Sequence, residues 1–214
     1  MERSFAPEIM DDPSAADELW ESFHRELGSL HRLLGNYNEV ISALQRGPAP
    51  VQRVLDIGCG NGELLHEIRR ALRVDVVGVE IHRPLRKAFD VPIVEGDATR
   101  DPLPEADVAV CVMVAHHLSE AHMTALIRNA GHSVRRLIIL DLVRHWIPLA
   151  LFRAFLYPFL HWAVAVDGVQ SVRRAYTARE LKALVERALA GSAARFEQTV
   201  TPMRSRQIID IFWS

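Results

Sequence analysis

Glycines and acidic residues at fixed spacing carry the clearest chemical signal in this chain of 214 residues. Asp56, Gly58, Gly60 and Gly62 stand at alternate positions in "LDIGCGNG", between an apolar run and an amphipathic stretch. Glycines let a ligand approach the backbone, and the first N–H groups of a following helix can bond it. A dinucleotide site would have its third glycine where this chain has Glu63. The loop therefore favours another small ligand, and Asp56 suits one with positive charge.

Two further acids follow the next two apolar runs. Glu80 ends "VDVVGVE", and Asp97 follows "VPIVEG" and precedes Ala98. Open α/β sheets bind ligands along the edge where their parallel strands end, so three acids at three strand ends indicate one shared site. Any one of them alone could equally be a solvated strand end.

Short apolar runs alternate with helical patterns, which predicts an α/β fold with a mostly parallel sheet and helices on both faces. The expected strands are 53–58, 74–80, 91–96, 106–114 and 135–143, and the helices lie near 62–72, 83–89 and 119–131. Thr177 and Glu180 form a capping box that opens another helix, and the final residues from Arg195 predict two strands, a hairpin interrupted by "TPMRS". That makes seven strands. Residues 1–48 are expected to be an N-terminal helical cap, with a break near Gly35, and 49–214 the main domain.

The order "LDIGCGNG", "VVGVE" and "VEGDA" resembles the class I S-adenosylmethionine-dependent methyltransferases, from about residue 30 to the C-terminus. The resemblance implies a Rossmann-like fold and S-adenosyl-L-methionine as cofactor. It also implies that Glu80 accepts hydrogen bonds from ribose hydroxyls and that Asp97 with Ala98 reads the adenine edge. The expected cofactor contacts are Asp56, Gly58, Cys59, Gly60, Glu80, Ile81, Asp97, Ala98 and Met113.

The stretch "CVMVAHHLSEAH" after the fourth strand offers the candidate catalytic residues. It lacks the Asp/Asn-Pro-Pro-aromatic motif of enzymes that methylate nucleobase amines. The inverted zinc-protease motif has His, Glu and His at positions 1, 4 and 5, whereas His117, Glu120 and His122 stand at 1, 4 and 6, so no metal is expected. His117 is predicted to be a general base, with His145 as the alternative, and His116 either contacts the acceptor or simply packs.

The apolar segment 145–166 is long enough to span a bilayer, but Arg153, Pro148 and Pro158 interrupt it. Strands of one sheet on either side also exclude a membrane span. We expect residues 145–168 to form a helical lid after the fifth strand, with apolar surface toward the acceptor, a dimer partner or a membrane surface.

The stretch "DGVQSVRRAYTARELKAL", together with "LHRLLGNYNEVISAL", resembles a bacterial subgroup of small-molecule methyltransferases related to quinone-biosynthesis and type III polyketide-associated enzymes. This implies a small hydrophobic acceptor, phenolic or polyketide-like, methylated on oxygen. Methylation on carbon or nitrogen, or a cofactor-binding subunit without turnover, remain as alternatives. Arg144, Arg173, Arg174 and Tyr176 are expected to bind the acceptor, although the pair Arg173 and Arg174 could equally be a solvated cluster.

Composition sets the remaining expectations. A net charge of −2 provides no basic field for nucleic acid, so none is expected as a partner. The acidic N-terminus has no apolar core of a secretory signal, and two cysteines suggest no disulfide framework, so a cytoplasmic protein is expected. A homodimer is also considered.

Overall fold

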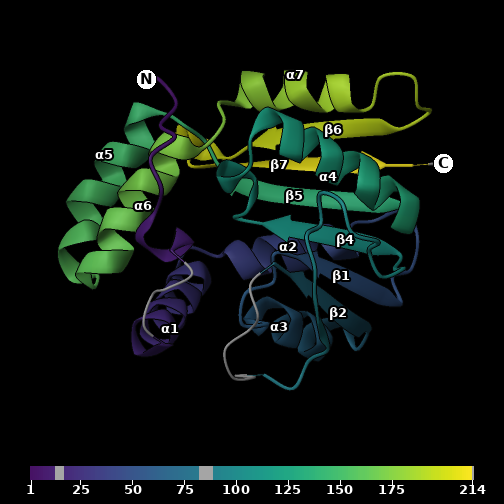
Figure 1. Cartoon of the computed structure of the whole chain (residues 1–214), viewed down its shortest axis with the longest axis horizontal. Coiled ribbons are helices and arrows are strands. Elements are labelled where there is room, and N and C mark those ends of the chain that lie inside the picture. Colours follow the sequence, from purple (N-terminus) through teal and green to yellow (C-terminus); the bar gives the residue numbers. More distant parts are fainter. Residues whose placement is uncertain (13–16, 82–88, 214) are drawn as a thin grey trace.

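The structure is a computed structural model, and it describes residues 1–12, 17–81 and 89–213. Its centre is a seven-stranded sheet in the order β3-β2-β1-β4-β5-β7-β6 (Figure 1). The strands are β1 (Arg53–Ile57), β2 (Asp75–Glu80), β3 (Ile93–Glu95), β4 (Val108–Val112), β5 (Arg136–Leu142), β6 (Arg195–Val200) and β7 (Arg206–Phe212). Only β7 runs against its neighbours, pairing antiparallel with both β5 and β6. This confirms the predicted sheet, including the C-terminal hairpin.

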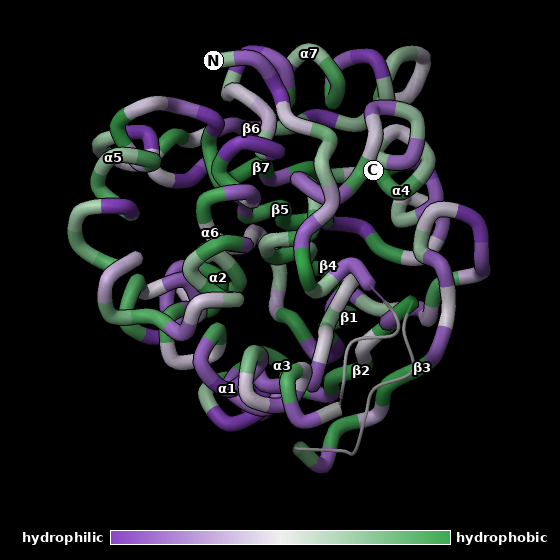
Figure 2. The backbone as a smooth tube through the Cα atoms, turned by 60° about the vertical axis from the view of Figure 1, so that its left-hand side comes forward, coloured by the Kyte–Doolittle hydropathy of each residue, from purple (hydrophilic) through white to green (hydrophobic). Residues whose placement is uncertain are grey.

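Both faces of the sheet are buried because the inner strands are nearly continuous runs of Val, Ile and Leu, which cannot leave either face in water. Helices α4 (Glu120–Ser133) and α7 (Ala178–Ala188) cover one face, and α2 (Asn36–Gln45) and α3 (Glu63–Leu72) cover the other. In Figure 2 the hydrophobic colour recurs along the inner strands, such as β2 and β5, whereas the edge strand β6 is largely hydrophilic.

Local signals fix where the helices begin. Thr177 and Glu180 form the predicted capping box at the start of α7, and Ser119 accepts a hydrogen bond from the N–H of His122 at the start of α4. Gly35, in the left-handed conformation, separates α1 (Asp17–Leu33) from α2 at the predicted break. Helix α2 shares its hydrophobic cluster with the sheet and α3, so it packs as part of the same layer; the predicted domain boundary at residue 48 stays a prediction.

A second group of helices lies at the ends of the strands (Figure 1, left). It comprises α1 and the insertion after β5, which forms α5 (Trp146–Phe155), the short helix η3 (Tyr157–Phe159) and α6 (Trp162–Arg174). The predicted insertion is therefore helical. None of the described helices is both long and apolar enough to cross a membrane.

Some predicted boundaries differ from the structure. Strand β3 has only three residues, and β4 ends at Val112 because Met113 turns to a φ of 56° before the short helix η2 (Ala115–His117). The interruption in the C-terminal hairpin is a short helix, η4 (Pro202–Arg204). The helix predicted at 83–89 falls on residues 82–88, which lie outside the described part of the chain.

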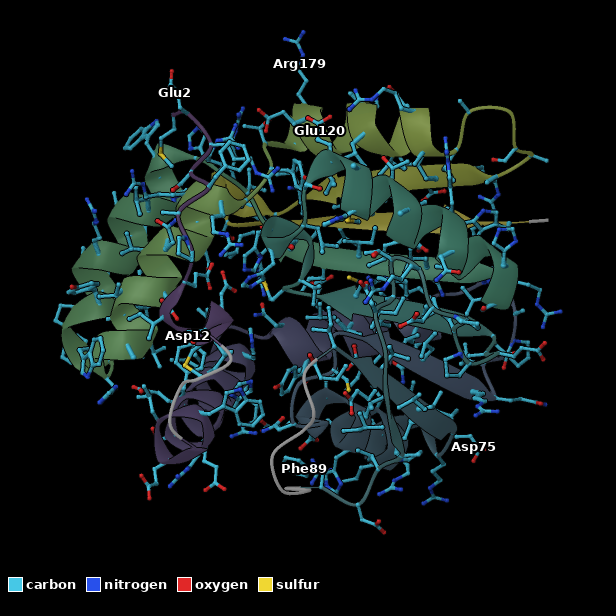
Figure 3. The ribbon with its side chains drawn as sticks, viewed as in Figure 1. Glu2, Asp12, Asp75, Phe89, Glu120 and Arg179 are labelled. Atoms are coloured by element: carbon cyan, nitrogen blue, oxygen red, sulfur yellow. The ribbon has the colours of Figure 1, made fainter. Side chains whose placement is uncertain are left out.

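The N-terminal segment, residues 1–12 including the short helix η1 (Ile9–Asp11), runs past α6 toward the strand ends (Figure 1). Figure 3 shows Asp12, the last residue of this segment, beside α1 and α6, whereas Asp75, the first residue of β2, lies at the opposite end of the sheet.

Candidate active site

A cavity of about 440 Å³ lies where the carboxyl ends of β1, β2 and β4 meet α1, α6 and the N-terminal segment. Every residue predicted to contact the cofactor lines this cavity: Asp56, Gly58, Cys59, Gly60, Glu80, Ile81, Asp97, Ala98 and Met113. The structure thus brings together residues from three strand ends and the loop after β4, although their contact with a cofactor stays a prediction.

The loop after β1 requires glycine at two positions that face the cavity. Gly58 and Gly60 have φ values of 74° and 53°, in the left-handed region that favours glycine. A Cβ atom at Gly58 would lie 2.5 Å from Cγ2 of Val114, whereas one at Gly60 would meet only the His24 ring, at 3.5 Å. The loop therefore presents bare backbone to the cavity.

Glu80 and Asp56 provide the two carboxyl groups of this end. The carboxylate of Glu80 accepts hydrogen bonds from the N–H of Gly60 at 2.8 Å and of Ile81 at 3.0 Å, so it is held against the glycine loop. Asp56 is buried, and burial together with the charge of Glu80 raises its pKa to about 8. A positively charged ligand would relieve this repulsion.

Asp97 has partners of its own. Its Oδ1 accepts hydrogen bonds from Thr99, from the N–H at 2.9 Å and the hydroxyl at 2.7 Å, and Arg100 lies 3.3 Å from Oδ2. The hydrogen bond from the Thr99 hydroxyl is the main reason that the pKa of Asp97 is lowered. To accept a hydrogen bond from the edge of an adenine ring, the Asp97 carboxylate would have to do so in addition to those from Thr99.

The end of the cavity where the sequence predicts acceptor binding is built around two adjacent imidazoles. His116 is buried, and its Nδ1 lies 2.7 Å from Oδ1 of Asp141, at the end of β5. His117 is one-third exposed, and its Nδ1 lies 3.0 Å from Oδ1 of Asp11. Burial opposes ionisation of Asp141, but the interaction with His116 keeps its pKa below the ordinary value.

Glu8 completes this end, and sequence reasoning missed it. Its carboxylate is buried beside both imidazoles, with Oε1 3.9 Å from Nε2 of His116 and Oε2 3.8 Å from Nε2 of His117. Burial raises its pKa to about 7. No motif surrounds Glu8, and only the path of the N-terminal segment places it here. We refer to Glu8, His116 and His117 as the Glu8 cluster.

The walls between the two ends are mainly apolar. They include Phe23 and Leu27 of α1, Phe152 of α5 and Val164 of α6. The predicted lid therefore contributes side chains to the cavity from both of its helices.

Five predicted residues do not line the cavity: His145, Arg144, Arg173, Arg174 and Tyr176. His145 caps α5 by accepting a hydrogen bond from the N–H of Ile147. Arg144 is buried, donates to the carbonyls of Met1 and Ala175, and pairs with Glu180. The side chain of Arg173 is exposed.

Tyr176 donates its hydroxyl hydrogen bond to the carbonyl of Leu118 and stacks under the guanidinium of Arg3. These contacts hold the ends of the lid and the N-terminal segment, and the roles predicted for these residues stay predictions.

A family of methyltransferase domains matches residues 21–188, which is most of the chain. The chain belongs to this family and is an S-adenosylmethionine-dependent methyltransferase. Among curated proteins, no sequence matches it.

Solved structures show the same fold at low sequence identity. The plantazolicin methyltransferase BpumL, in complex with a monoazolic desmethylPZN analog and SAH, is 12% identical with a TM-score of 0.68, covering 94% of this chain and 95% of its own. The plantazolicin methyltransferase BamL is 12% identical with a TM-score of 0.72, covering 92% and 93%. Human N-acetylserotonin methyltransferase, in complex with SAM, is 15% identical with a TM-score of 0.67; the match covers 93% of this chain and 57% of the human protein.

Proposed function

We propose that this methyltransferase acts on a hydroxyl group of a small hydrophobic acceptor, such as a phenolic or polyketide-like compound. The observation that supports this best is the composition of one cavity. One end consists of the glycine loop and strand-end acids, the walls are apolar, and the far end is the Glu8 cluster. Cofactor, apolar acceptor and basic groups would thus meet in one cavity.

The glycine-loop end fits S-adenosylmethionine. Glu80 presents a carboxylate beside Gly60, as ribose hydroxyls require, and a ligand ammonium group beside Asp56 would favour the ionised form of this buried carboxyl group. When bound, S-adenosylmethionine supplies a methyl group that the acceptor oxygen attacks, while the carbon–sulfur bond breaks and its electron pair stays on sulfur. The protein contributes by fixing the two reactants in line and excluding water.

The hydroxyl must also lose its proton. His117 is the most exposed of the three side chains of the Glu8 cluster, so it remains our candidate for the group that meets the hydroxyl. His145 has no support as the alternative base, because it does not line the cavity.

Labelled S-adenosylmethionine and a panel of phenolic polyketides test the proposal. We expect the label in a methyl ether of the product, located by NMR. We also expect the His117→Ala variant to transfer methyl about 10²- to 10⁴-fold more slowly with nearly unchanged cofactor affinity. His122→Ala, on the exposed face of α4, is the matched control. Label on carbon or nitrogen would favour the alternative chemistries, and cofactor binding without transfer to any acceptor would favour a non-catalytic subunit.

The outer face of the lid carries exposed aromatic side chains, among them Trp146, Phe155, Phe159 and Trp162. Contact of this face with a membrane surface or with a second copy in a homodimer stays a prediction, as do the cytoplasmic location and the lack of a nucleic-acid partner.

A further inference from the structure

The Glu8 cluster combines a carboxylate with two imidazoles whose ligand atoms all lie within 4.8 Å of one another. It joins the first residues of the chain to the loop after β4. We propose that this cluster is a binding site for a divalent first-row transition-metal ion.

The orientation of both imidazoles supports the proposal. Each Nδ1 faces a carboxylate, Asp141 for His116 and Asp11 for His117, so in a neutral ring the Nδ1–H donates to that carboxylate. The lone pair is then on Nε2, and both Nε2 atoms face Glu8. Carboxylates commonly orient metal-binding histidines in this way.

The contacts of Glu8 point to a positive partner between these atoms. The two distances from its oxygens to the imidazole Nε2 atoms, 3.9 and 3.8 Å, are too long for hydrogen bonds. Within the described part of the chain, the buried Oε1 atom has no hydrogen-bond partner at all. No hydrogen bond links Glu8 to either imidazole, and a buried oxygen without a partner, such as Oε1, is costly unless a cation satisfies it.

The separations are close to those of a metal site. Zinc binds imidazole nitrogen and carboxylate oxygen at about 2.0 to 2.2 Å, which in a tetrahedral site places neighbouring ligand atoms about 3.3 to 3.6 Å apart. With one ligand atom from each residue, the three atoms lie within 4.8 Å of one another, so no separation needs to shorten by more than about 1.5 Å. A small rotation of the partly exposed His117 side chain and of Glu8 can supply this.

The charges nearby also favour a cation. Glu8, Asp11 and Asp141 provide three carboxylates around the two rings. Arg174 pairs with Asp11 and lies 3.7 Å from Oε1 of Glu8, so its guanidinium offsets only part of this charge.

The site is also held in place from outside. The carboxylate of Asp167, buried in α6, accepts hydrogen bonds from the N–H groups of Ile9 and Met10 at 2.7 and 3.1 Å. Arg3 donates to the carbonyls of Arg174 and Leu118. These contacts fix the backbone next to Glu8, so the carboxylate is oriented before any ion binds.

Two imidazoles and one carboxylate are typical of sites for Zn²⁺ or Fe²⁺ that keep positions open for other ligands. Glu8, His116 and His117 all line the cavity, so those positions would face an acceptor. A consequence that rests on the proposed function is that a hydroxyl bound to the ion would lose its proton readily, and His117 would then act as a ligand and not as the general base.

Cobalt binding tests the site without any need for methyl transfer. Tag-free protein, first dialysed against a chelator, is titrated with Co²⁺ and followed by its visible d–d absorption, with Zn²⁺ as competitor. We expect one equivalent to bind. Asp141→Asn should weaken binding about 10- to 100-fold, as for other partners of metal-bound histidines, and Glu8→Gln and His117→Asn should weaken it further. His122→Asn, an exposed histidine outside the cluster, is the matched control and should bind normally.

S-adenosylhomocysteine binding by calorimetry confirms that each variant is folded. If Glu8→Gln fails to fold, the partly exposed His117→Asn carries the test. The proposal is overturned if the wild type binds no Co²⁺ in the micromolar range, if binding survives His117→Asn, or if His122→Asn abolishes it. If the protein transfers methyl but binds no metal, the metal-site proposal fails and the proposed function stands. The failure of one proposal can therefore be told from the failure of the other.

Discussion

At the scale of single residues, Glu80 is the most direct test of the cofactor end. Replacing it with alanine removes the carboxylate that the N–H of Gly60 holds against the loop. We expect the Glu80→Ala variant to bind S-adenosylmethionine more weakly by roughly 1.5 to 3 kcal/mol, the range for hydrogen bonds to a charged group. Calorimetry measures this. Glu95→Ala is the matched control. Glu95 of β3 lies opposite Glu80 of β2 in the strand register, but its side chain is exposed and outside the cavity. Equal affinity in the two folded variants would remove Glu80 from the site.

The buried carboxyl group of Asp56 should make the free energy of unfolding depend on pH. Its pKa is about 8 in the folded protein against 3.8 ordinarily, so between these values the folded state keeps a proton that the unfolded chain releases. The stabilisation of the folded state by this proton is therefore fully present below about pH 4 and is lost as the pH rises through about 8.

Asp56→Asn cannot lose this proton, so we expect the variant to gain free energy of unfolding relative to the wild type between pH 5 and pH 8. Urea unfolding without cofactor, at a series of pH values, measures the difference. Asp75→Asn, at an exposed position at the start of β2, is the control. A difference that stays constant across this range would contradict the buried, raised pKa of Asp56.

At the scale of elements, the turn from β1 to α3 depends on both backbone conformation and packing. In Gly58→Ala, the new methyl group adds a clash with Val114 to the strain of a positive φ; in Gly60→Ala, only the strain applies. Overpacking costs about 1 to 3 kcal/mol, so we expect Gly58→Ala to be the less stable of the two by about that amount in chemical denaturation. Equal stability would mean that Val114 moves aside at no cost.

At the scale of the whole molecule, a buried ion pair lies at the end of the sheet opposite the cavity. Near the start of β5, the buried Arg136 forms a two-pronged ion pair with Asp210 of β7 and donates to the carbonyl of Ala43. Asp210→Ala leaves that guanidinium without its counter-charge. We expect the free energy of unfolding to fall by about 3 kcal/mol, the low end for breaking a buried ion pair. The affinity for S-adenosylhomocysteine should stay unchanged.

Glu197→Ala is the control for this variant, because Glu197 faces Asp210 across β6 and β7 but is exposed. We expect it to change stability by less than about 0.5 kcal/mol. Weakened cofactor binding in folded Asp210→Ala would show that the two ends of the sheet are coupled.

Local sequence patterns were enough to predict the sheet and the group of residues that line one end of the cavity. The residues that mark this end, from Asp56 to Met113, each lie at or just after a strand. In a parallel sheet the carboxyl ends of neighbouring strands meet at one edge, so local patterns suffice to bring distant residues together. The capping box at Thr177 is local in the same sense, because its partners are three residues apart.

Which residues surround His116 and His117 at the other end of the cavity depends on tertiary contacts. Glu8 lies near the start of the chain and reaches His116, near its middle, through contacts to α6, and no periodic pattern encodes that path. Arg144 and Tyr176 have side chains that suit an acceptor, yet they bond backbone carbonyls of the N-terminal segment and the loops. These carbonyls lie outside the sheet and need donors when buried, and which side chain provides the donor depends on packing and not on spacing along the chain.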